Sequence, residues 1–177
     1  MLRALEPANG EAILPLADLK ARIRQIDDAE DADIGRMRDQ AIDWVERFTG
    51  IALLQRQFEY ADRQFCRRIM LPVGPIASVD AIAYDDSLGG EVELTSTDWR
   101  FGAGAVMSGA GTLWPMSIGD PGSVRITFTA GLENAEEEAP LLIAAVCVAV
   151  AAMFADRENP DFTAAMNVAS SYRMPGL

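Results

Sequence analysis

The chain has 177 residues, of which 50% are hydrophobic and 24% charged, a composition typical of a globular protein rather than a disordered one. Its 27 acidic and 15 basic side chains give a net charge of −12, which disfavours tight binding to phosphate groups and to anionic membranes. Because the chain contains no histidine, imidazole-based catalysis and histidine-ligated zinc sites are excluded.

The first stretch, residues 1–53, is predicted to be helical. A first helix over 16–24 is indicated by apolar residues three and four positions apart. A second helix is expected to end at Gly50, because glycine readily takes the left-handed conformation that follows a helix. The apolar stripe of this second helix consists of Ile34, Met37, Ala41, Val45 and Phe48.

The run 27–33 between these helices carries five acidic residues and invites comparison with a calcium-binding loop. Such a loop needs a turn glycine and a distal bidentate acid at fixed offsets. Here Gly35 is misplaced, and Arg38 stands where the distal glutamate would be. We therefore interpret the run as a helix N-terminus, whose dipole favours anions, and predict no metal site.

The middle stretch, residues 54–131, is predicted to be rich in β-strands, because apolar residues alternate with polar ones between turn-forming segments. The glycine-rich segment 102–111 lacks the spacing of a dinucleotide-binding motif or a P-loop, so we expect a flexible loop there. The expected strands are 57–60, 67–71, 79–84, 91–94 and 124–129.

The last stretch, residues 132–177, is predicted to be helical again, with its main helix over 139–158. Apolar side chains lie all round this helix, so it is expected to be buried on every side, by the inserted strands or by a subunit interface. Its apolar run is short for a membrane span, and no membrane association is expected. The chain ends in a tail that is either frayed or captured by a partner, with Tyr172, Arg173, Met174 and Leu177 as its contact candidates.

No catalytic, cofactor-binding or metal-binding residue can be assigned from the sequence, and we predict that the chain is not an enzyme. Cys66 and Cys147 are expected to be reduced core thiols, and Lys20 to lie on an exposed helix face. Paired carboxylates could still support glycosidase-type chemistry, so a small carboxylate-based enzyme remains an alternative.

Arg63, Arg67 and Arg68 form the densest cationic patch in the chain. They could meet acidic surfaces of a neighbouring copy, or they could be solvated strand ends. Both interpretations stay open at the level of the sequence.

Several landmarks follow one another in a characteristic order. They are 41–50 in the second helix, 71–79, 82–86 with its glycine turn, 124–131 ending in Thr-Ala-Gly, the apolar helix through 156–158, and Ser171-Tyr172-Arg173. In this order, over about residues 15–173, the chain resembles the head–tail connector, or adaptor, family of long-tailed phages and phage-derived gene transfer agents.

The resemblance implies an α+β fold, in which a helical bundle of N- and C-terminal helices carries an inserted β-rich subdomain. It also implies a ring of typically twelve copies in the virion neck, assembled in the bacterial cytoplasm. The C-terminal tail would reach the portal protein, another face would meet a stopper or tail-side neck protein, and DNA would pass through the channel without specific binding. The alternative within this class is another neck component, such as a stopper or tail-completion protein, for which a strand-dominated fold is expected.

Overall fold

The computed structural model describes residues 1–25 and 27–173, and it has the expected α+β fold. The chain divides into two compact units. One contains residues 1–6 and 56–130, and the other contains residues 7–55 and 131–173. The first six residues, which the sequence analysis placed with the helices, therefore belong to the unit of strands.

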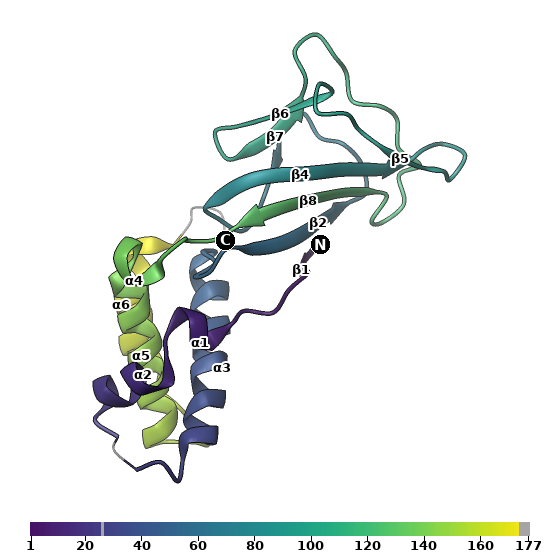
Figure 1. Cartoon of the computed structure of the whole chain (residues 1–177). Helices are drawn as coiled ribbons and strands as arrows, with labels where there is room; N and C mark the ends of the chain where they lie inside the picture. Colours follow the sequence, from purple (N-terminus) through teal and green to yellow (C-terminus); the bar gives the residue numbers. More distant parts are fainter. Residues whose placement is uncertain (26, 174–177) are drawn as a thin grey trace. The chain divides into compact units, whose positions relative to one another are not determined.

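The main sheet of the first unit is antiparallel, and its strands follow the order β1, β2, β8, β4, β5 (Figure 1). The terminal strand β1 was not predicted. It pairs with β2 through Leu2 opposite Tyr60, a partner far along the chain. The strands are β1 (Leu2–Ala4), β2 (Arg56–Asp62), β4 (Ile76–Asp85), β5 (Glu91–Glu93) and β8 (Val124–Ala130).

Strand β8 shows why the sheet has one buried face. Its residues alternate between buried and half-buried along the whole strand, as period-two side-chain geometry requires. The buried Phe128 lies directly opposite Phe58 of β2, with ring centroids 5.7 Å apart, and Ile126 lies opposite Ile82 of β4. These cross-strand pairs form the apolar core of this unit.

A smaller antiparallel sheet has the order β3 (Ile69–Met70), β7 (Ala105–Ser108), β6 (Trp99–Gly102). The strand expected over 67–71 is thus shortened to two residues. The segment 102–111, expected to be a flexible loop, instead contributes to a hairpin of β6 and β7. The turn between them has positive φ at both Ala103 and Gly104, the backbone geometry that suits a two-residue hairpin.

The second unit is a helical bundle, and α2 (Leu16–Ile23) and α3 (Asp31–Thr49) confirm the two predicted N-terminal helices. Gly50, which follows α3, has the left-handed φ of 75°. The C-terminal helix differs from expectation. A short α4, capped by the Asn134 side chain, precedes α5, and α5 ends at Ala155 rather than Glu158 because Asp156 is extended. The helices are α1 (Gly10–Ile13), α2 (Leu16–Ile23), α3 (Asp31–Thr49), α4 (Ala135–Glu138), α5 (Pro140–Ala155), α6 (Thr163–Ala169) and the 3₁₀ turn η1 (Ser170–Tyr172).

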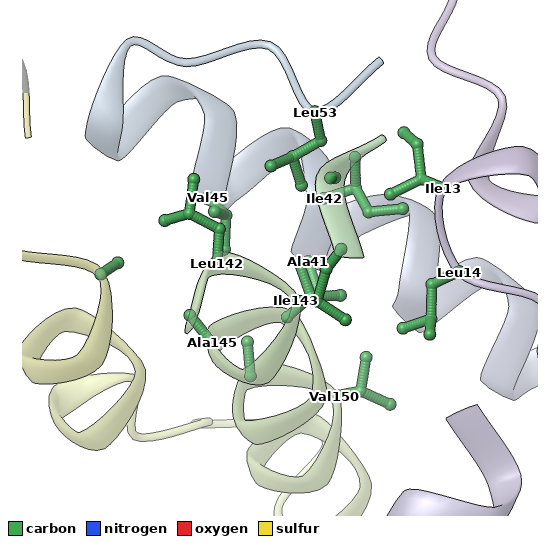
Figure 2. Close-up of a cluster of buried hydrophobic side chains, with 14 of the residues drawn as sticks. Ile13, Leu14, Ala41, Ile42, Val45, Leu53, Leu142, Ile143, Ala145 and Val150 are labelled. Carbon is green, nitrogen blue, oxygen red and sulfur yellow. The ribbon is translucent and has the colours of Figure 1, made fainter. Parts of the chain in front are cut away.

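The core of the bundle lies where α3 and α5 face each other, with α1, α2 and α6 packed around them. Figure 2 shows Ala41, Ile42 and Val45 of α3 gathered with Leu142 and Ile143 of α5. All five side chains are at most 1% exposed. Ala41 and Val45 belong to the predicted apolar stripe of α3, whereas Ile42 beside them was not part of it. This packing positions the surface of α5 described next.

Candidate protein–protein interface

Within its own chain, helix α5 is buried on one face only, so the remaining face is not covered by the inserted strands. The side chains of Leu142, Val146, Ala149 and Val150 have no solvent exposure. A second stripe, spaced three and four residues apart, stays half-buried or exposed, and we call it the open face of α5. It consists of Leu141, Ala144, Val148, Ala151 and Ala155.

The open face is apolar although it borders solvent. Leu141 is 49% exposed, and the described residues of α5 include no charged side chain. A surface helix of a single globular protein normally carries polar residues on its outer face. An apolar outer face on a well-formed helix therefore indicates a surface that a partner covers.

The C-terminal contact candidates lie partly within the described chain. The ring of Tyr172 packs against the bundle core, and the guanidinium of Arg173 lies 5.5 Å from the ring centroid of Phe48. Phe48 itself stacks on Trp44, which also stacks on Phe162. The chain is thus held to its own bundle as far as residue 173, whereas Met174 and Leu177 lie outside the described residues.

The structure brings two of the three predicted arginines together and adds one that sequence reasoning missed. Arg67 and Arg68 line a pocket of about 430 Å³ with Arg100, Met107 and Ser108. We call it the arginine pocket. Arg63 does not line it and instead donates a hydrogen bond from Nε to the carbonyl oxygen of Gly119.

Sheet pairing explains why Arg100 joins this group. Arg67 and Arg68 directly precede β3, which pairs with β7, and Arg100 of β6 pairs with Met107 of β7. The pairing of β3 with β7 and of β7 with β6 therefore brings together arginines that are distant in the sequence. No local signal in the sequence could have shown this, because it depends on the order of strands in the smaller sheet.

The segment before the pocket is held by aromatic packing and hydrogen bonds. The Trp114 ring stacks on Phe65 at a centroid distance of 4.6 Å, and its Nε1 donates to the carbonyl oxygen of Cys66 at 2.9 Å. The hydroxyl of Ser123 donates to the carbonyl oxygen of Arg63 at 2.6 Å. These contacts fix the position of residues 63–66, and Arg67 and Arg68 follow directly after this segment.

The acidic run 27–33 is used for ion pairs within the bundle. Lys20 lies 2.5 Å from a carboxylate oxygen of Asp28 and 2.5 Å from one of Asp31. Hydrogen bonds to these two carboxylates raise the pKa of Lys20, and the hydrogen bond from Lys20 lowers the pKa of Asp28. The Lys20 side chain is only 12% exposed, which corrects the expectation of an exposed lysine. The pairs join α2 to the start of α3.

The two cysteines also depart from expectation. Cys66 is exposed in the loop before β3 rather than buried in a strand. Cys147 is half-buried on α5, and burial raises the pKa of its thiol. An elevated thiol pKa keeps this group in its less reactive protonated form at neutral pH.

The described part of the chain gives no further site for metal or membrane chemistry. Among residues 1–25 and 27–173, no three cysteine, aspartate or glutamate side chains gather as a metal site would require. Within the same residues, no helix combines the length and the apolar character that crossing a bilayer requires.

Comparison with known proteins gives matches among solved structures. No protein-family model and no curated protein matches the chain. A chain in the neck of an empty gene transfer agent particle, computed with C6 symmetry, is 26% identical with a TM-score of 0.82. A chain in the virion of the native gene transfer agent particle gives the same values. A chain in the native neck, computed with C12 symmetry, is 25% identical with a TM-score of 0.80.

Each alignment covers 100% of this chain and 97% of the matched one, so the likeness extends over both units. This likeness supports a structural protein of a particle neck, the coarser part of what the sequence resemblance implies.

Proposed function

We propose that the chain is a ring-forming structural adaptor of the particle neck, joining the portal of a phage or gene transfer agent head to the tail. The observation that carries this proposal is the end-to-end likeness to chains of gene transfer agent necks. The C6 and C12 symmetry of those necks supports a ring of repeated copies.

The open face of α5 supports lateral packing between copies in such a ring. Copies in a closed ring contact each other through two different surfaces, so each copy must present two surfaces that its own fold leaves uncovered. An apolar helix stripe that its own bundle leaves open suits one of them, because covering it removes apolar area from water.

The fold also favours an adaptor over the alternative neck components. A stopper or tail-completion protein is expected to be dominated by strands. Here the 19-residue α3 and the 16-residue α5 form a bundle with its own core. The terminal helices therefore match the adaptor organisation better.

In the proposed neck, DNA passes through the channel without specific binding. A net charge of −12 per copy suits this role, because a negative wall does not retain phosphate groups. The tail would contact the portal through Tyr172, Arg173, Met174 and Leu177, with the tail-side neck protein at another face.

A pair of variants in the producing bacterium tests lateral packing. Ala151→Glu places a charge on the open face of α5, and the control Ala164→Glu places the same charge on an exposed position of α6. We expect Ala151→Glu to fold normally but to lower the yield of joined particles, whereas Ala164→Glu leaves the yield unchanged. Normal joining by Ala151→Glu particles would contradict packing through this face.

The role of the tail is tested separately by deleting residues 171–177. We expect heads and tails to accumulate unjoined. Wild-type protein tagged at its N-terminus should be found at the neck by electron microscopy. Normal joining after the deletion would refute portal binding by the tail, and a wild-type label absent from the neck would refute the adaptor itself.

A further inference from the structure

The basic side chains of the chain differ in whether they pair with carboxylates of the same chain. Most form ion pairs with carboxylates of the same chain. These are Arg3, Lys20, Arg22, Arg36, Arg38, Arg47, Arg125 and Arg157. The three arginines of the arginine pocket, Arg67, Arg68 and Arg100, are exposed and pair with no carboxylate within residues 1–25 and 27–173. Arg24 and Arg63 are exposed and also pair with no carboxylate there, but they do not line the pocket. The arginine pocket is thus a concave place where three such arginines gather.

The arginine pocket suits a carboxylate ligand. Guanidinium groups bind carboxylates and phosphates through paired N–H donors, and several in one pocket attract an anion strongly. The net charge of −12 repels a long polyanion such as DNA. A short protein segment with one or two carboxylates avoids much of this repulsion, so the observations favour an acidic protein surface.

The acidic side chains can be sorted in the same way. In the run 27–33, Asp28 and Asp31 are engaged by Lys20, and Arg157 engages Glu30 and Asp33. In the hairpin of β4 and β5, Arg125 engages both Asp85 and Glu91.

Exposed acidic side chains that bind no cation within the described residues also occur singly, for example Glu6, Glu93 and Asp120. The segment 133–138 carries two of them close together. Glu136 pairs with Arg22, and the Glu138 carboxylate accepts hydrogen bonds from the backbone N–H groups of Glu133 and Asn134. The side chains of Glu133 and Glu137 are exposed and bind no cation within the described part of the chain. Glu133 lies just before α4, and Glu137 lies within it, four residues further along the chain.

We propose that, in the ring, the arginine pocket of one copy binds the Glu133 and Glu137 carboxylates of the neighbouring copy. This inference rests on the proposed ring. A ring contact joins two different surfaces of the same chain, and the arginine pocket and the 133–138 segment are two such surfaces with opposite charge. The contact also offsets the mutual repulsion of copies that each carry a net charge of −12.

A charge swap in the producing bacterium tests the contact. The variants are Arg67→Glu/Arg68→Glu, Glu133→Arg/Glu137→Arg, and the two combined. We expect each double variant to lower the yield of joined particles at least about tenfold, because like charges then face each other, and the combination to restore most of it. Circular dichroism should show unchanged folding, since all four side chains are exposed.

The control is Arg24→Glu/Arg47→Glu, which makes the same change in net charge at exposed positions outside the pocket and gives up only the surface ion pair of Arg47 with Asp43. We expect it to join particles at near wild-type yield. Normal joining by the pocket variant, or failure of the combined variant to recover, would overturn the contact. If purified wild-type protein also bound duplex DNA and Arg67→Glu/Arg68→Glu lost that binding, a phosphate ligand would replace the carboxylates. The neck label on wild-type protein separates these outcomes from a failure of the adaptor proposal.

Discussion

The carboxylate of Glu46 accepts a hydrogen bond at Oε1 from the backbone N–H of Leu53, at 2.8 Å and shielded from solvent. Glu46 lies in the last turns of α3, and Leu53 lies where the chain has turned past Gly50. Next to this bond, the N–H of Leu132 donates to the carbonyl oxygen of Ala52 at 3.0 Å. The buried carboxylate therefore holds the segment by which the chain leaves the bundle, beside the segment by which it returns.

Replacing Glu46 tests this anchor. Glu46→Ala leaves the buried N–H of Leu53 without its acceptor, and we expect it to lower the free energy of unfolding by about 1–3 kcal/mol. Glu46→Gln keeps a carbonyl acceptor of the same length, so its loss should be clearly smaller. Urea denaturation of the purified protein measures both. Equal losses would show that the side-chain charge matters more than the hydrogen bond to Leu53.

Gly131 occupies the return segment in a backbone conformation that side chains rarely adopt. Its φ is 130°, and a Cβ placed there would lie 2.3 Å from the carbonyl oxygen of Leu54. Gly131→Ala therefore combines backbone strain with a clash against main chain. Gly119→Ala is the control, because Gly119 also has a positive φ but has open space around it.

We expect Gly119→Ala to cost about 1–2 kcal/mol from backbone strain alone, and Gly131→Ala to cost distinctly more. Thermal unfolding followed by circular dichroism compares the two. Similar melting temperatures would mean that the return segment can move away from residues 54 and 55 without penalty.

The elements that the sequence predicted well are those with a strong local pattern. Strand β8 and helix α3 carry clear two-residue and 3.6-residue periodicities, and both formed as expected. Strand β1 has no such pattern, because its formation depends on pairing with β2. The hairpin of β6 and β7 was missed because its turn places Ala103 at a positive φ, which a sequence search for glycine turns does not reveal.

The candidate interface could be predicted only in part, for a similar reason. The apolar character of α5 is visible in the sequence, but which stripe stays open depends on where α3 and α6 pack. Arg67 and Arg68 are adjacent in sequence and were found, whereas Arg100 reaches them only through the strand order of the smaller sheet. Long-range pairing is the information that a single sequence does not display.

The pH dependence of stability should follow the paired carboxylates. Hydrogen bonds from Arg125 lower the pKa of Asp85, and the hydrogen bond from Lys20 lowers that of Asp28, each below the ordinary value of 3.8. In the unfolded chain these groups take up protons at higher pH than in the folded one. Their stabilising effect is thus complete above about pH 5 and is lost as the pH falls below 4 through the folded pKa values.

Thermal unfolding between pH 2 and pH 8 checks this expectation. We expect a plateau from about pH 6 to pH 8, because the chain has no histidine to titrate there, and a steep decline below about pH 4. Asp85→Asn removes one of the responsible carboxylates and should make the acid decline shallower. An unchanged acid decline in Asp85→Asn would show that its pair with Arg125 does not contribute to the pH dependence.

The two faces of α5 can be distinguished by one substitution made at two nearby alanines. Ala149 has no solvent exposure, whereas Ala151 lies on the open face. Ala149→Glu must bury a charge in a closely packed core, and we expect a loss of several kcal/mol in the free energy of unfolding. Val146→Asp, at another fully buried position, should have a similar effect for the same reason.

Ala151→Glu should change the stability of the isolated protein by no more than about 0.5 kcal/mol, as for an ordinary surface substitution. Chemical denaturation of the three variants measures these differences. Equal destabilisation by Ala149→Glu and Ala151→Glu would mean that the bundle itself covers the open face, and no surface on α5 would then remain for a neighbouring copy.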